Sequence, residues 1–364
     1  MKIKEITNYL EIIAPLSYQE KYDNCGLIVG DKNTVVTKAL ITLDCTEAIV
    51  DEAIEIGSNF IIAHHPVIFQ GIKKLNGNNY IERTVIKAIR NNIAIYAIHT
   101  NLDNVLNGVS ANIAKRLEVK NCKILSPKKD LLRQLVVYCP ISDSDKLRNE
   151  LFNAGAGNVG SYNECSFSSI GKGTFRAGKG CDPYLGKIGE RHIEKEEKIE
   201  VIFPTYKEKE IISLMKRVHP YEEVAYQIYI LDNAYQHVGS GVVGELRKEM
   251  HVESFLKMLK TNMNTDCVRH SKLVKTKIKK VAICGGSGSF LLSYAKQVQA
   301  DIFITSDFKY HEFFDAEDDL IIADIGHYES EQFTKDLIYD LLTEKFTKFA
   351  VQLSKVNTNP IKYI

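Results

Sequence analysis

Two adjacent histidines, His64 and His65, directly follow the apolar run Phe60–Ala63 in this sequence of 364 residues. β-Branched residues in a run of this length predict a buried strand, and Pro66 predicts its end because proline cannot donate to a β-ladder. A single histidine at such a position is most often a core or turn residue with satisfied hydrogen bonds. Successive strand side chains point to opposite faces, so two neighbouring histidines could reach two adjacent metal positions. We therefore predict a dinuclear metal site, which requires carboxylates from elsewhere in the chain.

Three further candidate ligands lie just beyond other predicted strands. Asp103 follows the strand predicted over residues 93–98, although an aspartate there could also belong to a turn. His327 and Glu331 follow the strand predicted over 320–325 and share one face if a helix begins near His327. Glu331 could alternatively be a carboxylate favoured by the helix dipole. Open α/β sheets place ligands at the carboxyl ends of strands, so these three residues and the histidine pair could hold two divalent ions if one carboxylate bridges.

The elements that must position these residues alternate in the first and last thirds of the chain. The first third reads as strand, helix, strand, helix, strand, with the strands over residues 39–43, 60–63 and 93–98. The last third repeats the pattern, with strands over residues 281–284, 301–305 and 320–325 and a long amphipathic helix from 327 onward. This alternation predicts mostly parallel sheets covered by helices.

The middle of the chain has a different pattern. Residues 131–231 read as β-α-β-β-α-β, which is the ferredoxin-like order. Six glycines between 171 and 189 predict a long hairpin or mobile loop between its two halves. No GxxxxGK[ST] motif supports a phosphate site there. The glycine-rich turn at 285–289 could bring backbone N–H groups to an anion or could simply allow tight packing.

Composition limits the class of protein. The length predicts two or three domains. With 47 basic and 46 acidic residues, the net charge does not indicate a surface that binds nucleic acid. Eight cysteines lack a CxxC pair, and the first residues lack the apolar core of a signal peptide. No stretch approaches the ~18 apolar residues of a membrane span. We therefore expect a cytoplasmic protein with reduced thiols and no membrane partner.

Five segments, taken in order, resemble the signatures of the NIF-three-like family: IIAHHPVIF, IHTNLD, VAICGGSGS, ITSDFKYHE and DIGHYESE. Its members are also called dinuclear metal centre proteins and GTP cyclohydrolase I type 2 homologues. The resemblance covers essentially the whole chain and implies a core of two α/β halves with mainly parallel sheets, residues 1–127 and 235–364. It also implies an inserted ferredoxin-like, PII/CutA-like α+β domain over 128–234. The segment HPYEEVAY, residues 219–226, resembles the end of such an insert. Family members further imply a homohexameric ring, with metal sites facing an internal cavity and inserts near the openings.

The same resemblance implies roles for particular residues. The metal ligands it implies are His64, His65, Asp103, His327 and Glu331, with Glu331 as the bridging carboxylate. His99 and His311 match histidines that line the cavity without binding metal, so they are candidates for proton transfer, for substrate contact or for support of the ligands. Two positions depart from the family pattern: Tyr22 replaces a frequent Trp, and Ser306 replaces the Gly that usually precedes the equivalent of Asp307.

Hydrolysis is the reaction that this site suits, because paired divalent ions acidify water and polarise a carbonyl, phosphoryl or ring carbon. We expect a metal-dependent hydrolase of a small nucleotide-like substrate, with opening of the purine ring of GTP as one version. Metal handling, sensing or regulatory interaction without turnover is the alternative. A ring that encircles nucleic acid is disfavoured by the neutral charge. Histidine and carboxylate ligands permit Zn, Fe, Mn, Co or Ni.

Overall fold

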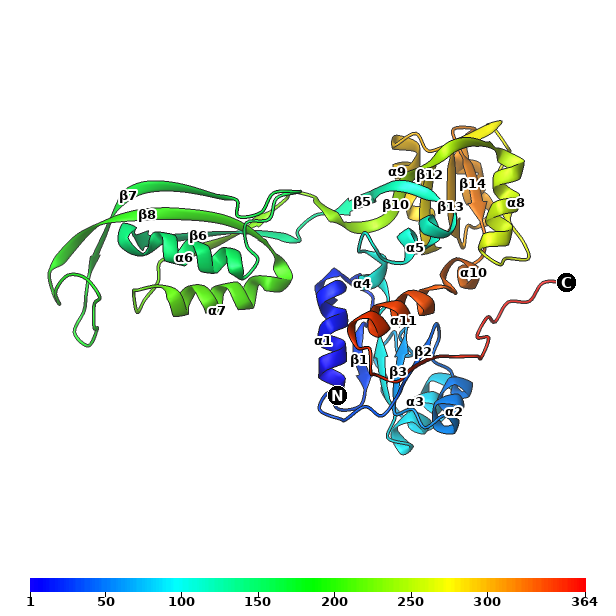
Figure 1. Ribbon diagram of the computed structural model, residues 1–364, viewed down its shortest axis with the longest axis horizontal. Coiled ribbons are helices and arrows are strands. Elements are labelled where there is room, and N and C mark those ends of the chain that lie inside the picture. The colour runs from blue at the N-terminus through cyan, green and yellow to red at the C-terminus, as the bar shows by residue number, and fades with distance from the viewer. The chain divides into compact units, whose positions relative to one another are not determined.

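The computed structural model describes residues 1–364, which form two compact units (Figure 1). The first unit combines Met1–Pro127 with His237–Ile364, and the second is Lys128–Gln236. Neither unit contains a helix that is both long enough and apolar enough to cross a membrane.

The amino-terminal half of the first unit is built on a five-stranded sheet. Its strands are β1 (Gly26–Val29), β2 (Ala39–Thr42), β3 (Phe60–Ala63), β4 (Ala94–Ala97) and β15 (Val351–Leu353). Their order is β1-β4-β3-β2-β15, and only β1 runs antiparallel to its neighbour. The strand that precedes the histidine pair, β3, is central and completely buried. The expected mainly parallel sheet is therefore present in this half.

Helices cover both faces of this sheet, because alternate strand residues point to opposite sides. The helices are α1 (Ile3–Ile13), α2 (Glu47–Glu55), α3 (Tyr80–Arg90) and α11 (Thr334–Lys345). Ile62 belongs to the core that contains residues of α1 and α11, whereas its neighbour Ile61 belongs to the core with α2 and α3. A strand buried on both faces explains the continuous apolar run of β3.

The carboxyl-terminal half contains a six-stranded sheet that is mixed rather than mainly parallel. Its strands are β5 (Val119–Lys128), β10 (Tyr235–His251), β11 (Arg269–His270), β12 (Lys277–Ser287), β13 (Ile302–Ser306) and β14 (Ile321–Asp324). Their order is β11-β14-β13-β12-β10-β5. The three central strands β12, β13 and β14 are parallel, but β10 and β11 are antiparallel to their neighbours. The expectation of a mainly parallel sheet is wrong for this half, because strands absent from the predicted alternation close both sides.

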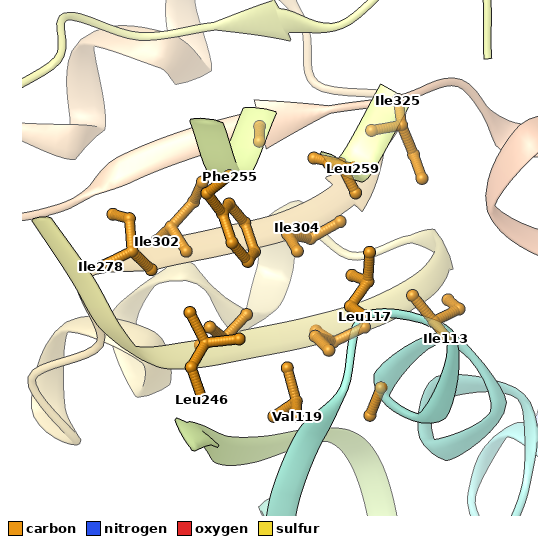
Figure 2. Packing of buried hydrophobic residues seen from close by; sticks show 14 of the residues in the cluster. Ile113, Leu117, Val119, Leu246, Phe255, Leu259, Ile278, Ile302, Ile304 and Ile325 are labelled. Atoms are coloured by element: carbon orange, nitrogen blue, oxygen red, sulfur yellow. The ribbon is translucent and has the colours of Figure 1, made fainter. Parts of the chain in front are cut away.

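The main core of this half lies against one face of the mixed sheet. Phe255 and Leu259, on one helix, pack with Ile302 and Ile304 of the central strand β13 (Figure 2). The helices of this half and its connections are α4 (Thr100–Asp103), α5 (Val109–Arg116), α8 (Val252–Asn262), α9 (Leu292–Gln297) and α10 (His327–Glu331). The short 3₁₀ helices of the unit are η1 (Leu16–Tyr18), η3 (Ser289–Leu291) and η4 (Tyr310–Ala316). The long helix expected from residue 327 is instead two helices, α10 and α11.

The second unit has its own sheet and core. Its elements are β6 (Leu132–Pro140), α6 (Ile141–Asn153), β7 (Ser166–Arg176), β8 (Arg191–Pro204), η2 (Thr205–Lys207), α7 (Glu208–Val218) and β9 (Tyr226–Leu231). The sheet order is β7-β8-β6-β9, and each pairing is antiparallel. Residues of α6 and α7 share one core with Leu135, Val137, Ile199 and Val201, so both helices pack on the same sheet face. The observed element order is β-α-β-β-α-β, the ferredoxin-like order.

Candidate metal centre

The paired histidines extend the line of β3 beyond its last residue. The backbone N–H of His64 donates to Thr42 O at 3.2 Å, and that of His65 donates to Leu43 O at 2.9 Å. Both residues therefore remain hydrogen-bonded to the end of β2 although β3 itself ends at Ala63, and their ring centroids lie 4.9 Å apart. The His64 side chain is fully buried, and that of His65 is 15% exposed.

Two short helices deliver the remaining candidate ligands. Asp103 ends α4, which begins three residues after β4. His327 and Glu331 are the first and last residues of α10, which follows β14. Gly326 between them and the strand has φ +90°, a conformation that glycine adopts without the steric cost of a Cβ. All five sequence-predicted ligands thus lie at or just beyond the carboxyl ends of parallel strands.

The structure brings these five residues together in two groups that share Glu331. One group is His64, Asp103 and Glu331, and the other is His65, His327 and Glu331. Within each group the potential ligand atoms lie within 4.8 Å of one another. Of the two groups that share Glu331, one therefore contains His64 and the other contains His65.

Three atoms in this cluster are buried without a hydrogen bond: His64 Nε2, Asp103 Oδ1 and Glu331 Oε2. Glu331 Oε2 lies 2.9 Å from His65 Nε2 and 3.1 Å from His327 Nε2, within ion-pair distance of both rings. A buried polar atom without a partner costs about 1–3 kcal/mol. Imidazole nitrogens and carboxylate oxygens are ligands for Zn, Fe and Mn, so these residues fit divalent metal ions.

Hydrogen bonds at the opposite ring nitrogens orient three of the histidines. Nδ1 of His64 lies 2.8 Å from Ile98 O, Nδ1 of His65 lies 2.7 Å from Asp44 Oδ1, and Nδ1 of His327 lies 2.6 Å from Asp307 Oδ2. A carbonyl or carboxylate oxygen can only accept, so each Nδ1 carries a proton. In the neutral ring Nε2 then presents a lone pair to the cluster, as in carboxylate–histidine–metal arrangements.

Sequence reasoning did not assign roles to Asp44 and Asp307, the carboxylates behind His65 and His327. Their position was the available signal. Asp44 follows β2 of the five-stranded sheet, and Asp307 follows β13 of the six-stranded sheet. Asp307 has φ +61°, which turns the chain directly after β13. Ser306, where the family pattern usually has glycine, stays buried within β13. Ser306 is thus the last residue of β13, and the left-handed residue that follows the strand is Asp307.

The glycine-rich turn at residues 285–289 packs closely against the cluster. Gly286 has φ +66°, and a Cβ placed on it would overlap Glu331 Oε1. Its N–H donates to Ser330 Oγ at 2.9 Å. Of the two alternatives for this turn, an anion site or close packing, Gly286 is used for close packing against the shared carboxylate.

The charges in the cluster shift one another's titration. Burial alone would lower the pKa of His65, but Glu331 and Asp44 outweigh it and raise that pKa to about 10. Burial is likewise outweighed at His327, where Glu331 and Asp307 raise the pKa to about 11. Burial lowers the pKa of His64 to about 4. Without metal, therefore, protons occupy His65 and His327 while His64 stays neutral.

The pKa values of the two carboxyl groups in the cluster, Asp103 and Glu331, are shifted in opposite directions. Burial and the Glu331 carboxylate raise the pKa of Asp103 well above its usual value. Burial would also raise the pKa of Glu331, but His327 and His65 hold it well below its usual value. Glu331 is therefore the anion around which the other groups gather.

His99 lies beside the cluster, but His311 does not. The His99 ring centroid is 5.2 Å from that of His64 and 5.1 Å from that of His65, and these three histidines form a further group of possible ligands. His311 is exposed on η4, where it contacts the rings of Tyr310 and Phe314, and it does not line the cavity described below. Within one chain, the structure brings only the first of these predicted cavity histidines to the site.

A carboxylate that sequence reasoning also missed orients His99. Nδ1 of His99 lies 2.9 Å from Asp23 Oδ1, and Asp23 Oδ2 accepts from the N–H and hydroxyl of Thr100. Burial would raise the pKa of Asp23, but His99 and Thr100 hold it well below its usual value. His99 is therefore paired with an ionised, fully buried aspartate.

The cluster opens into a cavity of about 640 Å³. Four candidate ligands, His65, Asp103, His327 and Glu331, line it together with the neighbouring His99. Apolar and aromatic groups also line it, and they include Tyr22, Val67, Phe69, Phe290 and Ile361. The chain end contributes Thr358 and Asn359, whose side chains donate to Asp44 Oδ2 at 2.5 Å and Glu329 Oε1 at 2.9 Å. The cavity thus combines polar ligand atoms with a wall suited to an apolar or planar group.

Comparisons with known proteins agree on one family. The family model Duf34/NIF3 (NGG1p interacting factor 3) matches residues 1–360. A Bacillus subtilis protein described as GTP cyclohydrolase 1 type 2 homolog is 36% identical, over 99% of this chain and 98% of its own length. A crystal structure of a Bacillus cereus protein related to NIF3 matches with a TM-score of 0.85 and 34% identity, over 100% and 99% of the two chains. The crystal structure of Staphylococcus aureus protein SA1388 matches with a TM-score of 0.78 and 32% identity, over 100% and 99%.

Proposed function

Because the chain belongs to the Duf34/NIF3 family, we propose that it binds two divalent metal ions and hydrolyses a small nucleotide-like substrate. The observation that carries this proposal is the set of three buried ligand atoms without hydrogen bonds, His64 Nε2, Asp103 Oδ1 and Glu331 Oε2. For His64 Nε2 and Asp103 Oδ1 this lack of a partner is costly in the metal-free protein, and binding of cations would remove the cost.

The residues divide into two ligand sets with one shared member. His64 and Asp103 would hold one ion, His65 and His327 would hold the other, and Glu331 would bridge them. Divalent ions bound there would polarise a carbonyl or phosphoryl oxygen and acidify water. The carboxylates of Asp44 and Asp307 keep the Nδ1 protons of their histidines in place, so Nε2 remains available as the ligand.

His99 is the candidate for proton transfer. Its Nδ1 is bonded to the ionised Asp23, which orients the ring and stabilises the imidazolium that forms when Nε2 takes a proton. Its side chain is 12% exposed and lines the same cavity as the candidate ligands. This Asp–His pair would return the proton to a leaving group at the end of the reaction.

The substrate class rests on the shape and lining of the cavity. Tyr22, Phe69 and Phe290 offer aromatic surface for a planar ring, and about 640 Å³ is a normal volume for a small-molecule site. The curated Bacillus subtilis relative carries the name GTP cyclohydrolase 1 type 2 homolog, which makes GTP the first substrate to test.

A second candidate function is metal handling or regulation without turnover. The observation that favours it is the second unit, Lys128–Gln236, a compact body with its own core. We propose that this unit is an inserted PII/CutA-like domain between the two halves of a metal-binding core. Modules with this element order commonly bind effectors, although fold alone does not establish a function. We also propose a homohexameric ring as the assembly, which the native mass in solution tests.

Metal analysis combined with a turnover assay tests the first proposal. Wild-type protein should bind about two ions per chain after reconstitution and should turn over GTP or a related nucleotide. Glu331→Gln should lose both ions and the activity, because it removes the shared carboxylate charge. Glu329→Gln is the matched control, since Glu329 is also buried two residues away, and a glutamine amide oxygen can still accept from Asn359. Metal binding without turnover across a nucleotide panel would favour the second candidate, and failure to bind metal would refute both.

A further inference from the structure

The second unit contains a cavity of about 580 Å³ that the proposed hydrolysis does not use. It lies on the sheet face opposite α6 and α7. Ile199 and Val201 of β8 pack against the helices, whereas Glu196 and Lys198, which line the cavity, alternate to the other face. Residues of the 177–190 and 219–225 connections complete the lining.

A buried carboxylate without a cationic partner lies in this cavity. Glu196 is 9% exposed, accepts a hydrogen bond from the Tyr221 hydroxyl at 3.0 Å and forms no ion pair. Lys198, the nearest lysine on the same face of β8, is paired with Glu200. Charged side chains are rarely buried without a partner, because desolvation of a charge is costly. Glu196 therefore has the capacity to accept a charged donor from a ligand.

Strand register shows which neighbours share this face. Gly171 is paired with Glu196, and Phe175 is paired with His192, so Gly171, Gly173 and Phe175 lie on the face of Glu196. The cationic residues Lys172 and Arg176 alternate to the opposite face of β7 and are exposed, although both also border the cavity. Neither of these cations forms an ion pair with Glu196.

Aromatic rings form the wall beside the carboxylate. The ring of Tyr221 lies 5.7 Å from that of Phe175 and 6.4 Å from that of Tyr184, measured between centroids. Burial and the Glu196 carboxylate raise the pKa of Tyr221, so its hydroxyl remains a donor at neutral pH. Aromatic faces attract cations through the ring quadrupole, and this attraction strengthens when water is excluded.

We propose that this cavity binds a small organic cation, an ammonium or guanidinium with an apolar body. The charged N–H group donates to Glu196, and the apolar body lies against Phe175, Tyr184 and Tyr221. The lining also contains the carboxylates Glu222 and Glu223 and the cations Lys172, Arg176 and Lys198, so the preference for a cation rests on the buried Glu196, which has no cationic partner. The buried Glu196 carboxylate would repel an anion placed against it, which disfavours an anionic ligand at this position. A divalent metal is also disfavoured, because all groups of three or more potential metal ligands lie in the other unit.

Calorimetric titration of the full-length protein tests this inference with three probes of similar shape: benzylammonium, benzyl alcohol and benzoate. Wild-type protein should bind benzylammonium at least about tenfold more tightly than benzyl alcohol and should not bind benzoate. Glu196→Gln should abolish the preference for the cation, since an amide can still accept from Tyr221 but carries no charge.

A second variant keeps the test decisive if Glu196→Gln does not fold. Gly171 has open space where a Cβ would lie and no positive φ, so Gly171→Leu should fill the cavity without backbone strain and abolish binding of benzylammonium. Gly71→Ala in the first unit, with similarly open surroundings, is the control and should bind as wild type does. Equal affinity for benzylammonium and benzyl alcohol, unchanged binding in either cavity variant, or no saturable binding to wild type would overturn the proposal.

Discussion

Gly286 and Glu331 are in such close contact that any side chain at position 286 would occupy the space of the Glu331 carboxylate. Gly286→Ala should therefore displace the residue shared by both ligand groups and lower metal occupancy by about tenfold or more. The left-handed backbone at φ +66° adds a stability cost of about 1–2 kcal/mol. Elemental analysis after dialysis and a thermal melt measure the two effects, with Gly71→Ala as the control. Full metal occupancy in Gly286→Ala would show that metal binding by Glu331 does not depend on its close contact with Gly286.

The carboxylates behind the histidines should control metal affinity without touching the metal. Asp307→Asn and Asp44→Asn remove the negative charge that holds the Nδ1 protons of His327 and His65. Each should weaken metal binding by about 10–100-fold. Competition with a chelator of known affinity measures the change. Asp51→Asn, which alters only a surface pair with Lys87, should have wild-type affinity. Equal loss in all three variants would contradict the role given to Asp44 and Asp307.

Metal binding should release protons and strengthen as pH rises. In the metal-free protein the pKa of His65 is raised to about 10 and that of His327 to about 11, so both are protonated at neutral pH. A metal ion must displace these protons, so each displaced proton makes the apparent affinity fall about tenfold per unit decrease in pH below those values. Calorimetry in two buffers with different ionisation enthalpies counts the protons released. Binding that is independent of pH between 6 and 9 (roughly the range in which both histidines start protonated) would refute this assignment.

The second unit should lose stability in mild acid through His219. Burial lowers the pKa of His219, whose Nε2 donates to Tyr138 O at 2.8 Å and whose Nδ1 accepts from the Tyr221 N–H at 3.1 Å. A lowered folded-state pKa means that the unfolded chain binds more protons in this range. Stability from His219 is therefore complete above the unfolded pKa of about 6.5 and is lost as pH falls through the lower folded value.

The variant His219→Gln isolates that contribution. A glutamine amide can donate to Tyr138 and accept from Tyr221, but it does not titrate. Thermal melts of the full chain between pH 7.5 and 4.5 (roughly the range that spans histidine titration) should show a smaller loss in the variant than in wild type. Identical pH dependence in both proteins would assign the acid sensitivity to other groups.

Local signals in the sequence were sufficient to place the candidate ligands at the ends of strands and on a short helix. The apolar run Phe60–Ala63 with His64, His65 and Pro66 predicted a strand that ends at two imidazoles, and β3 ends at Ala63. The four-residue spacing of His327 and Glu331 placed both on one short helix, α10. These features depend on strand alternation and helix period, which adjacent residues determine.

Tertiary structure decided how the ligands group and what orients them. Asp23, Asp44 and Asp307 meet their histidines only because β-strands from separate parts of the chain align in register, and sequence periodicity does not encode that alignment. The same applies to the antiparallel strands β10 and β11, which make the second sheet mixed.

His311 is a residue that the sequence suggested for the cavity but that the tertiary structure places elsewhere. Its segment matches the family signature, but the fold of one chain leaves this histidine exposed on η4, away from the cluster that contains His99. Residue type and spacing determined which groups are available for metal chemistry. Long-range strand pairing and packing decided which of them share a site, because only those interactions bring distant segments within bonding distance.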